Sequence, residues 1–102
     1  MKSIRIHNHG SSDVLTVDEL DDPVVSRKKI KIKIEACSMN HLDIWVRNGL
    51  PGLTMKLPLT LGSDAAGTVV EMGKGVKGFS CGDKVVIQPG IFNNSSGDLI
   101  KG

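Results

Sequence analysis

The sequence contains no long apolar run, which excludes one class of protein at the outset. A membrane-spanning helix requires about 18 or more consecutive apolar residues, and no segment of the 102-residue chain approaches that length. The first residues, MKSIRIHNHGSSD, also lack the continuous apolar stretch of a secretory signal. We therefore expect an intracellular, cytoplasmic protein that does not bind membranes.

The chain also has little net charge. Its 13 basic and 11 acidic side chains leave a formal charge of +2 at pH 7, too small to argue for a nucleic acid or an anionic lipid as partner. Most of the basic excess lies in RKKIKIK, residues 27–33. A solvated strand face explains this run better than a binding patch does.

Cysteine is scarce as well. Cys37 and Cys81 are the only two, and they do not form a Cys-x-x-Cys pattern. Disulfides are rare in a reducing compartment. We therefore expect both residues to be small and buried or half-buried, and not to form a disulfide.

What the chain does contain is a series of short strand patterns. The clearest is KIKIKIEA, residues 29–36, where apolar and charged side chains alternate with the period of a half-buried strand. Other alternating or β-branched stretches predict further strands at residues 3–9, 14–20, 67–72 and 84–88. His7 and His9 are interpreted as ordinary residues of the first of these. After Pro89 the sequence is rich in turn residues and predicts no further element.

One segment, MNHLDIWVRNG, has the period of a helix instead. Its apolar residues recur at i, i+3 and i+4, as on one helix face: Leu42, Trp45 and Val46. Asn40 is a suitable N-cap and Gly49 a suitable terminator. We predict a short helix at residues 41–48.

These elements indicate the fold class. A chain of 102 residues is long enough for one domain with a modest core and too short for two. Short strands separated by glycine and proline, with one short helix, favour a mainly β fold, a partly open β-barrel. Residues 1–102 are expected to form this single domain.

Gly73, Gly75 and Gly78 form the pattern Gly-x-Gly-x-x-Gly, the fingerprint of a dinucleotide-binding turn. Such a turn needs a helix that opens at the third glycine and offers its amide groups to the pyrophosphate. Here Gly82 and Asp83 follow within a few positions, and a β-branched run comes next. We interpret the glycines as a connection between two strands, where positive φ is required.

A longer pattern surrounds these glycines. The segment GSDAAGTVVEMGKGVKGFSCGDKVV resembles a block of the N-terminal catalytic domain of the medium-chain dehydrogenase/reductase superfamily, which includes zinc-type alcohol dehydrogenases and quinone oxidoreductases. The matching positions are Gly62, Asp64, Gly67, Val69, Gly73, Val76, Phe79, Gly82, Asp83 and Val85. Upstream, NHLDIWVRNGLPG resembles the helix that carries the first active-site residues of that family. The resemblance covers essentially the whole chain.

The resemblance implies a GroES-like β-barrel that forms one wall of a cleft. In the family the other wall is a Rossmann domain, which follows this domain and is absent from the 102 residues. We therefore expect a piece of a longer enzyme that is inactive by itself. A homo-oligomer is one option for the full-length enzyme. NADP or NAD would be bound mainly by the missing domain, and nicotinamide and substrate would meet in the cleft.

Zinc-dependent members of the family carry Cys-x-Thr/Ser-Asp at the start of the active-site helix and Gly-His-Glu in the second block. This chain has Asn40 in place of the cysteine and Leu42 in place of the hydroxyl residue. Ser63 and Asp64 replace the His-Glu pair. An amide, a hydroxyl and one carboxylate are poor substitutes for thiolate and imidazole.

No second set of zinc ligands is apparent. Cys37 and His41 lack the two further donors that close a tetrahedral site, so we interpret them as structural. The family's cysteine-rich lobe for structural zinc would begin after Pro89, where this chain has no cysteine. We predict no zinc, which places the chain nearer the zinc-independent, quinone-oxidoreductase-like branch.

The resemblance assigns roles to the helix residues. Asn40, as a catalytic residue, would hydrogen-bond a substrate carbonyl or the nicotinamide carboxamide; a helix N-cap is the alternative. His41 would bind the cofactor pyrophosphate, or it is a solvated surface histidine. Asp43 would support the substrate pocket, paired with an arginine. Trp45 would face the substrate, with packing into the core as the alternative.

Ser63 and Asp64 are the candidates from the second block. They would line the substrate pocket, with Asp64 as a catalytic residue. Alternatively, they form a turn before the strand that is predicted to begin at Gly67. Arg47 is expected to be an exposed or paired cation at the helix C-terminus.

We therefore expect the N-terminal catalytic domain of an NAD(P)-dependent oxidoreductase with a small-molecule carbonyl, quinone or enone as hydride acceptor. Without zinc, hydrogen bonds and conjugation must stabilise the developing oxyanion, which favours activated acceptors. Two alternatives stay open. One is a zinc-dependent alcohol dehydrogenase domain, and the other is a stand-alone GroES-like module for binding or assembly.

Overall fold

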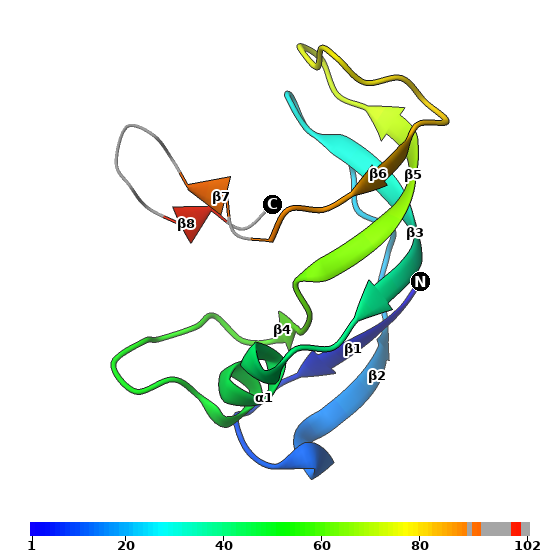
Figure 1. Ribbon diagram of the computed structural model, residues 1–102. Helices are drawn as coiled ribbons and strands as arrows, with labels where there is room; N and C mark the ends of the chain where they lie inside the picture. The colour runs from blue at the N-terminus through cyan, green and yellow to red at the C-terminus, as the bar shows by residue number, and fades with distance from the viewer. Residues whose placement is uncertain (90, 93–98, 101–102) are drawn as a thin grey trace. The chain divides into compact units, whose positions relative to one another are not determined.

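The structure is a computed structural model that describes residues 1–89, 91–92 and 99–100. By their internal contacts the residues form two compact units. Unit 1 contains Met1–Asp22 and Met39–Gly62, and unit 2 contains Pro23–Ser38 and Ser63–Gly102. Each unit contains its own three-stranded antiparallel sheet (Figure 1).

The sheet of unit 1 has the strand order β2-β1-β4. Its elements, with the 3-10 turn η1 that precedes β2, are β1 (Lys2–Ile6), η1 (Ser12–Val14), β2 (Leu15–Glu19) and β4 (Leu59–Thr60). Because successive side chains point to opposite faces of a strand, Ile6 and its partner Leu15 share one face while Arg5 and its partner Thr16 share the other. Ile6 is fully buried and is the centre of the apolar side.

The sheet of unit 2 has the order β3-β5-β6. Its strands are β3 (Ile30–Ser38), β5 (Asp64–Met72) and β6 (Lys84–Val86). Figure 1 shows β3 and β5 as long curved ribbons side by side, and register shifts interrupt their pairing after Lys31 and after Ile34. Val69, in the central strand, is almost completely buried. A separate two-stranded sheet contains β7 (Ile91–Phe92) and β8 (Leu99–Ile100).

Two glycines of unit 2 allow close backbone contacts. A Cβ atom on Gly67 would lie 2.0 Å from the carbonyl oxygen of Lys33, and one on Gly73 would lie 1.9 Å from that of Ser26. Atoms do not approach so closely without a backbone shift. Both positions therefore require glycine.

The segment with the Gly-x-Gly-x-x-Gly pattern connects the antiparallel strands β5 and β6, as predicted. Gly75 and Gly78 have φ of 82° and 84°, in the left-handed region that favours glycine. No helix occurs at residues 73–83, all of which the structure describes. These glycines are a strand connection and not a nucleotide cradle.

The expected mainly β fold with one short helix is confirmed, and α1 (His41–Asn48) has the predicted bounds. The sequence does not predict β4. It also predicts no element after Pro89, which is wrong for β7 and β8, while residues 90, 93–98 and 101–102 lie outside the described part of the chain. No helix among the described residues is long and apolar enough to cross a membrane.

The first strand is shorter than predicted. It ends at Ile6, so the interpretation of His7 and His9 as ordinary strand residues is wrong. Their rings make specific contacts instead: His7 with the side chain of Asp18, and His9 with the backbone at the end of α1.

Candidate active site

The candidate residues Asn40, His41, Asp43 and Trp45 gather at the start of α1, in unit 1. Asn40 is the N-cap, with extended backbone angles, and forms a capping box with Asp43. The backbone N–H of Asn40 donates to Oδ2 of Asp43 at 2.9 Å, and the N–H of Asp43 donates to the carbonyl of Asn40 at 3.0 Å. Asp43 therefore fixes the first helical turn through the Asn40 backbone, whereas the resemblance implies an arginine partner. Gly49, with φ of 94°, ends the helix.

The other end of α1 is fixed to the segment that follows β1. The Nε–H of Arg47 donates to the carbonyl of Gly10, and the N–H of Gly10 donates to the carbonyl of Arg47, both at 3.1 Å. The Nδ1–H of His9 donates to the carbonyls of Val46 and Arg47 at 3.1 and 3.2 Å. Arg47 is thus a half-buried, hydrogen-bonded residue, and α1 is held at both termini.

The apolar side chains of α1 remain accessible. The helix has no buried residue, and Trp45 is 52% exposed. Its indole meets the imidazole of His41 edge to face, with ring centroids 5.3 Å apart and an interplanar angle of 63°. Packing of Trp45 into a core is therefore not observed, and the helix presents an indole and an imidazole on one accessible surface.

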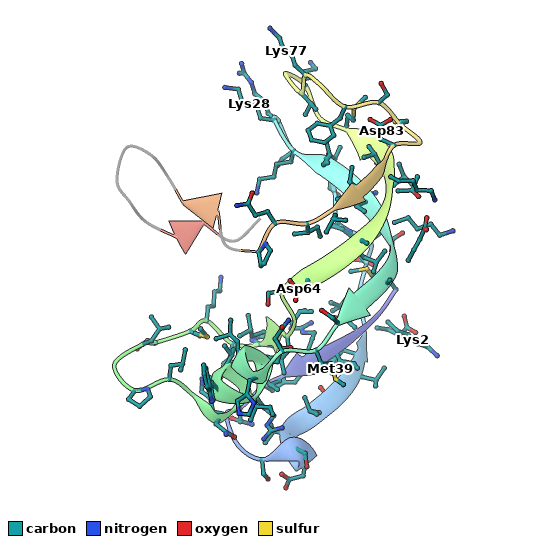
Figure 2. The ribbon with its side chains drawn as sticks, in the orientation of Figure 1. Lys2, Lys28, Met39, Asp64, Lys77 and Asp83 are labelled. Carbon is teal, nitrogen blue, oxygen red and sulfur yellow. The ribbon has the colours of Figure 1, made fainter. Side chains whose placement is uncertain are left out.

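Ser63 and Asp64 belong to unit 2, whereas the candidate residues of α1 belong to unit 1. Asp64, labelled in Figure 2, is the first residue of β5. The alternative prediction, a turn before a strand that begins at Gly67, is therefore wrong. The hydroxyl of Ser38 donates to Oδ2 of Asp64 at 3.0 Å across the β3–β5 pair. Ser63 is half-buried directly before the strand. Ser38 is a contact of the candidate site that sequence reasoning missed, because the strand register brings it there.

The side chains present do not fit a zinc site. In the described part of the chain there is no group of three or more His, Cys, Asp or Glu residues that is arranged to hold a metal ion. Catalytic zinc needs three protein ligands and structural zinc needs four, with thiolate and imidazole preferred. The amide of Asn40 and the carboxylate of Asp64, at the positions that match family ligands, are not such a set.

Both cysteines are free and exposed, so the expectation of buried or half-buried thiols is wrong. Cys37 lies near the end of β3, opposite Ala65 of β5. Cys81 lies in the turn before β6. Alternation along a strand identifies the two faces but does not say which face is covered.

A polar cluster on the sheet of unit 2 also escaped sequence reasoning. The Nζ of Lys84 donates to Oε1 of Glu35 at 2.8 Å and to the hydroxyl of Thr68 at 2.7 Å, and Thr68 donates to Glu35. Hydrogen bonds from Lys84 and Thr68 hold the pKa of Glu35 below its ordinary value. Glu35 and Lys84 border a shallow depression of about 260 Å³. In the sequence, Glu35 is distinguished only as the one acidic residue at the charged positions of the alternating run 29–36.

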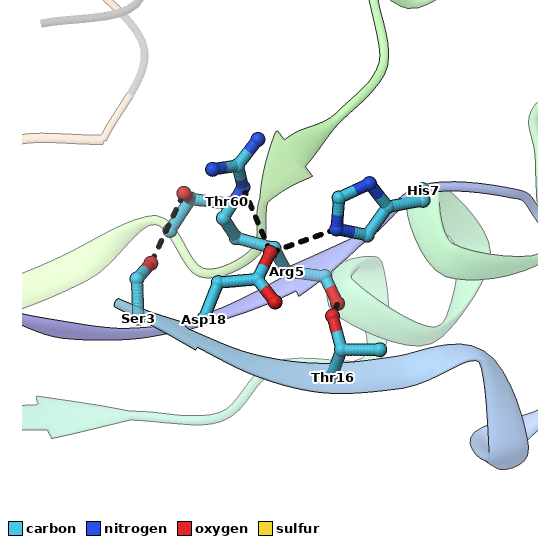
Figure 3. Close-up of polar contacts among 6 residues, drawn as sticks. All are labelled: Ser3, Arg5, His7, Thr16, Asp18 and Thr60. Atoms are coloured by element: carbon cyan, nitrogen blue, oxygen red, sulfur yellow. Dashed lines mark hydrogen bonds and ion pairs between the residues drawn. The ribbon is translucent and has the colours of Figure 1, made fainter. Parts of the chain in front are cut away.

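A second polar cluster covers one face of the sheet of unit 1 (Figure 3). Its centre is Asp18, which His7 and Arg5 contact, and the hydroxyl of Thr16 donates to the Arg5 carbonyl at 3.2 Å. The side chains of Ser3 and Thr60 are hydrogen-bonded beside it. The alternation of residues 3–9 predicts a polar face but not these pairings, which depend on the register of β1, β2 and β4.

The chain is similar to oxidoreductases over most of its length. Residues 26–100 match the family described as alcohol dehydrogenase GroES-like domain. The chain is 34% identical over 100 residues to the NAD-dependent alcohol dehydrogenase of Sulfolobus acidocaldarius, covering 93% of this chain and 28% of that protein. It is also 34% identical over 86 residues to the quinone oxidoreductase of Rattus norvegicus, covering 83% of this chain and 26% of that protein.

Solved structures share the fold. A crystal structure of an NAD-dependent alcohol dehydrogenase matches with a TM-score of 0.83 and 39% identity, over 90% of this chain and 27% of that one. The Escherichia coli quinone oxidoreductase in complex with NADPH matches with a TM-score of 0.79 and 35% identity, over 84% of this chain and 26% of that one. The GroES-like fold class is thereby confirmed. The chain spans only 26% to 28% of the length of the relatives named here.

Proposed function

Because the chain belongs to the family of alcohol dehydrogenase GroES-like domains, we propose that it forms the N-terminal catalytic domain of an NAD(P)-dependent oxidoreductase. The full enzyme would transfer hydride between nicotinamide and a conjugated carbonyl, quinone or enone. A nucleotide-binding domain outside these residues would supply most contacts to NADP or NAD. The observation that carries the proposal is the similarity, over most of this chain, to both an alcohol dehydrogenase and an NADPH-bound quinone oxidoreductase.

Asn40 is the residue to which we assign stabilisation of the acceptor oxygen. Its backbone is fixed by the capping box with Asp43, so its side chain starts from a defined position. A carboxamide offers two N–H donors, and a donor aimed at a developing oxyanion lowers the barrier most when it is already oriented. Asp43 is then a positioning residue, since it acts through Asn40.

His41 is the residue to which we assign a contact with the cofactor phosphates. It is exposed at the first position of α1, where the partial positive charge of the helix N-terminus favours an anion. The edge-to-face contact with Trp45 limits the orientation of the imidazole. The nicotinamide cofactor supplies the hydride chemistry itself.

We also assign substrate contacts to Trp45 of unit 1 and, separately, to Ser63 and Asp64 of unit 2. Half of the Trp45 side chain is accessible and offers a flat apolar surface to a planar acceptor. Asp64 is held by the Ser38 hydroxyl, which orients its carboxylate. Because the residues at the zinc-ligand positions do not suit zinc, hydrogen bonds must stabilise the oxyanion. Such a site favours conjugated acceptors as substrates.

The test uses the full-length parent enzyme and follows NADPH and NADH oxidation with a quinone, an enone and a simple ketone. We expect turnover of the quinone or enone and little turnover of the ketone. Asn40→Ser retains a good helix cap but removes the carboxamide, so it should lower kcat about a hundredfold without unfolding the domain. Asn48→Ser, at the other end of α1, is the matched control and should leave kcat unchanged. Equal activity of Asn40→Ser and the parent would contradict the assignment.

A second candidate is a zinc-dependent alcohol dehydrogenase. The relative from Sulfolobus acidocaldarius, an NAD-dependent alcohol dehydrogenase that matches 93% of the chain, favours an alcohol as substrate, whereas the zinc dependence rests on the family resemblance alone. Metal analysis of the full-length protein distinguishes the two. Equimolar zinc that survives chelation and is required for alcohol oxidation supports this candidate, whereas full quinone reduction in metal-free protein supports the first.

A further inference from the structure

Two turns that are far apart in the sequence meet at one end of unit 2. The N–H of Lys28 donates to the carbonyl of Lys74 at 2.8 Å, and the N–H of Gly73 donates to the carbonyl of Lys29, also at 2.8 Å. These bonds join the turn before β3 to the connection between β5 and β6. The cations that they bring together, here called the basic tip, are Arg27, Lys28, Lys29, Lys74 and Lys77. Figure 2 shows Lys28 and Lys77 projecting from the same end of the unit.

The charges of the basic tip are not neutralised within the described part of the chain. All its members are exposed, and none takes part in an ion pair between described residues. The carboxylate next to the tip along β5, that of Glu71, is already paired with Lys31 at 3.2 Å. The positive run of residues 27–33 is therefore more than a solvated strand face, because its first three cations lie in the turn before β3.

One residue of the basic tip, Lys28, is held in a backbone conformation that lysine seldom adopts. Lys28 has φ of 60°, the sole positive φ of a non-glycine residue in the described segments. A Cβ atom on Gly75 would lie 3.4 Å from Cγ of Lys28, so the lysine stem lies over the glycine. The hydrogen bond to Lys74 holds Lys28 in this conformation. A strained backbone that places a cation beside others is typical of ligand-binding sites.

We propose that the basic tip binds a soluble, compact anion that carries several phosphate groups. Clustered phosphates suit this set, because lysine ammonium groups and an arginine fork form charge-assisted hydrogen bonds with phosphate oxygens. The cations occupy two adjoining turns and not a long stripe, which fits a small anion better than an extended polymer. Single-stranded nucleic acid would need aromatic stacking surfaces, and Phe79 is the one aromatic residue between residues 46 and 91. The basic tip shares no residue with the proposed active site.

The same geometry predicts a linked effect on stability. Like charges gathered at one tip repel each other in the absence of a ligand. Removal of one charge should therefore leave the free protein equally or more stable while it weakens anion binding. If these lysines had no ligand, their removal would not weaken anion binding, whatever its effect on stability.

The experiment titrates sodium tripolyphosphate into the ¹⁵N-labelled 102-residue chain at constant ionic strength. We expect saturable amide shifts at residues 27–29 and 74–78. Lys28→Gly, which suits the positive φ, combined with Lys74→Gln should weaken binding at least about tenfold, since each charged contact contributes more than a kilocalorie per mole. Lys2→Gln and Lys56→Gln, two exposed cations of unit 1, are the matched controls and should bind like the parent. If the double variant does not fold, Lys77→Gln replaces it, because the backbone of Lys77 forms no hydrogen bond with the turn before β3 among the described residues.

Several results would overturn the proposal. Shifts that do not saturate, or that chloride at the same ionic strength reproduces, would reduce the effect to ionic screening. Equal losses in the Lys2 or Lys56 controls would show that total charge is responsible. Tighter binding of a single-stranded oligonucleotide, or binding only to vesicles with phosphorylated inositol lipids, would assign the tip to a different partner. None of these outcomes bears on hydride transfer by the parent enzyme, so the two proposals can fail independently.

Discussion

His7 and Asp18 are joined by a hydrogen bond of 2.7 Å between Nε2 and Oδ2, from the residue after β1 to the neighbouring strand β2 (Figure 3). Arg5 approaches the same oxygen, with its Nε at 3.6 Å. The hydrogen bond from His7 is the main reason that the pKa of Asp18 lies below its ordinary value. A surface carboxylate with a single partner would contribute little to stability, but this one contacts both an imidazole and a guanidinium on one sheet face.

The depressed pKa of Asp18 predicts a loss of stability in acid. A carboxylate whose folded pKa is lowered stabilises the fold above its unfolded pKa, and this contribution disappears as the pH falls through the folded pKa. The loss should begin near the ordinary value of 3.8 and continue below it. Urea unfolding from pH 6 to pH 2.5 measures it: the slope of stability with pH should be smaller in Asp18→Asn and in His7→Ala than in the parent.

The control for that prediction is Asp21→Asn, an exposed carboxylate of the same unit that forms no side-chain hydrogen bond or ion pair with the described residues. It should retain the parent slope between pH 6 and pH 2.5. Identical curves for Asp18→Asn and the parent would show that the cluster around Asp18 does not contribute to acid sensitivity.

The close contact at Gly67 leads to a prediction about the spacing of β3 and β5. A Cβ on this residue would lie 2.0 Å from the Lys33 carbonyl, so Gly67→Ala must push β5 away from β3 or distort the pair. We expect a loss of about 3 kcal/mol in the free energy of unfolding, as for other substitutions that overpack a site. Gly78→Ala meets no atom within 4 Å and carries only the strain of positive φ, so it should cost about 1 kcal/mol. Equal costs for the two variants would contradict the close contact.

Local signals explain what could be predicted from the sequence. The bounds of α1 follow from Asn40 and Gly49, because cap residues act within one turn of themselves. The connection between β5 and β6 follows from Gly75 and Gly78, whose positive φ is a local property. In both cases the deciding interaction spans only a few positions of the chain.

The rest depended on pairings between distant residues. The two residues of β4 have no strand signal of their own and are recognised only through their pairing with Arg5 and Ile6. Asp64 meets Ser38 because the antiparallel pairing of β3 with β5 places the two residues opposite each other. The exposure of Cys37 depends on what covers its sheet face. None of these relationships can be derived from composition or periodicity.

The hydrogen bonds of His9 lead to a prediction about the stability of the C-terminus of α1. The Nδ1–H of His9 donates to the carbonyls of Val46 and Arg47 at the helix C-terminus. These carbonyls also accept the N–H groups of Gly49 and Gly10. His9→Ala should lower the free energy of unfolding by about 1 kcal/mol, the usual contribution of one such hydrogen bond. Asn8 is an exposed neighbour whose side chain forms no hydrogen bond within the described part of the chain, so Asn8→Ala should have no measurable effect. Amide hydrogen exchange at Val46 and Arg47 gives a local readout and should accelerate only in His9→Ala.

Variants of Asp43 can separate two contributions to the stability of the first turn of α1. The Oδ2 of Asp43 accepts the N–H of Asn40 at 2.9 Å, and its charge faces the positive end of the helix dipole. Asp43→Ala removes both contributions and should destabilise the chain by about 1 kcal/mol. Asp43→Asn keeps an acceptor oxygen and loses only the charge, so it should cost about half as much, and its deficit should shrink as salt is added because the dipole effect is screened. Unfolding in urea at low and high salt measures both. A deficit for Asp43→Asn that equals that of Asp43→Ala at every salt concentration would mean that the acceptor oxygen has no part in the cap, and the orientation of Asn40 would then need another cause.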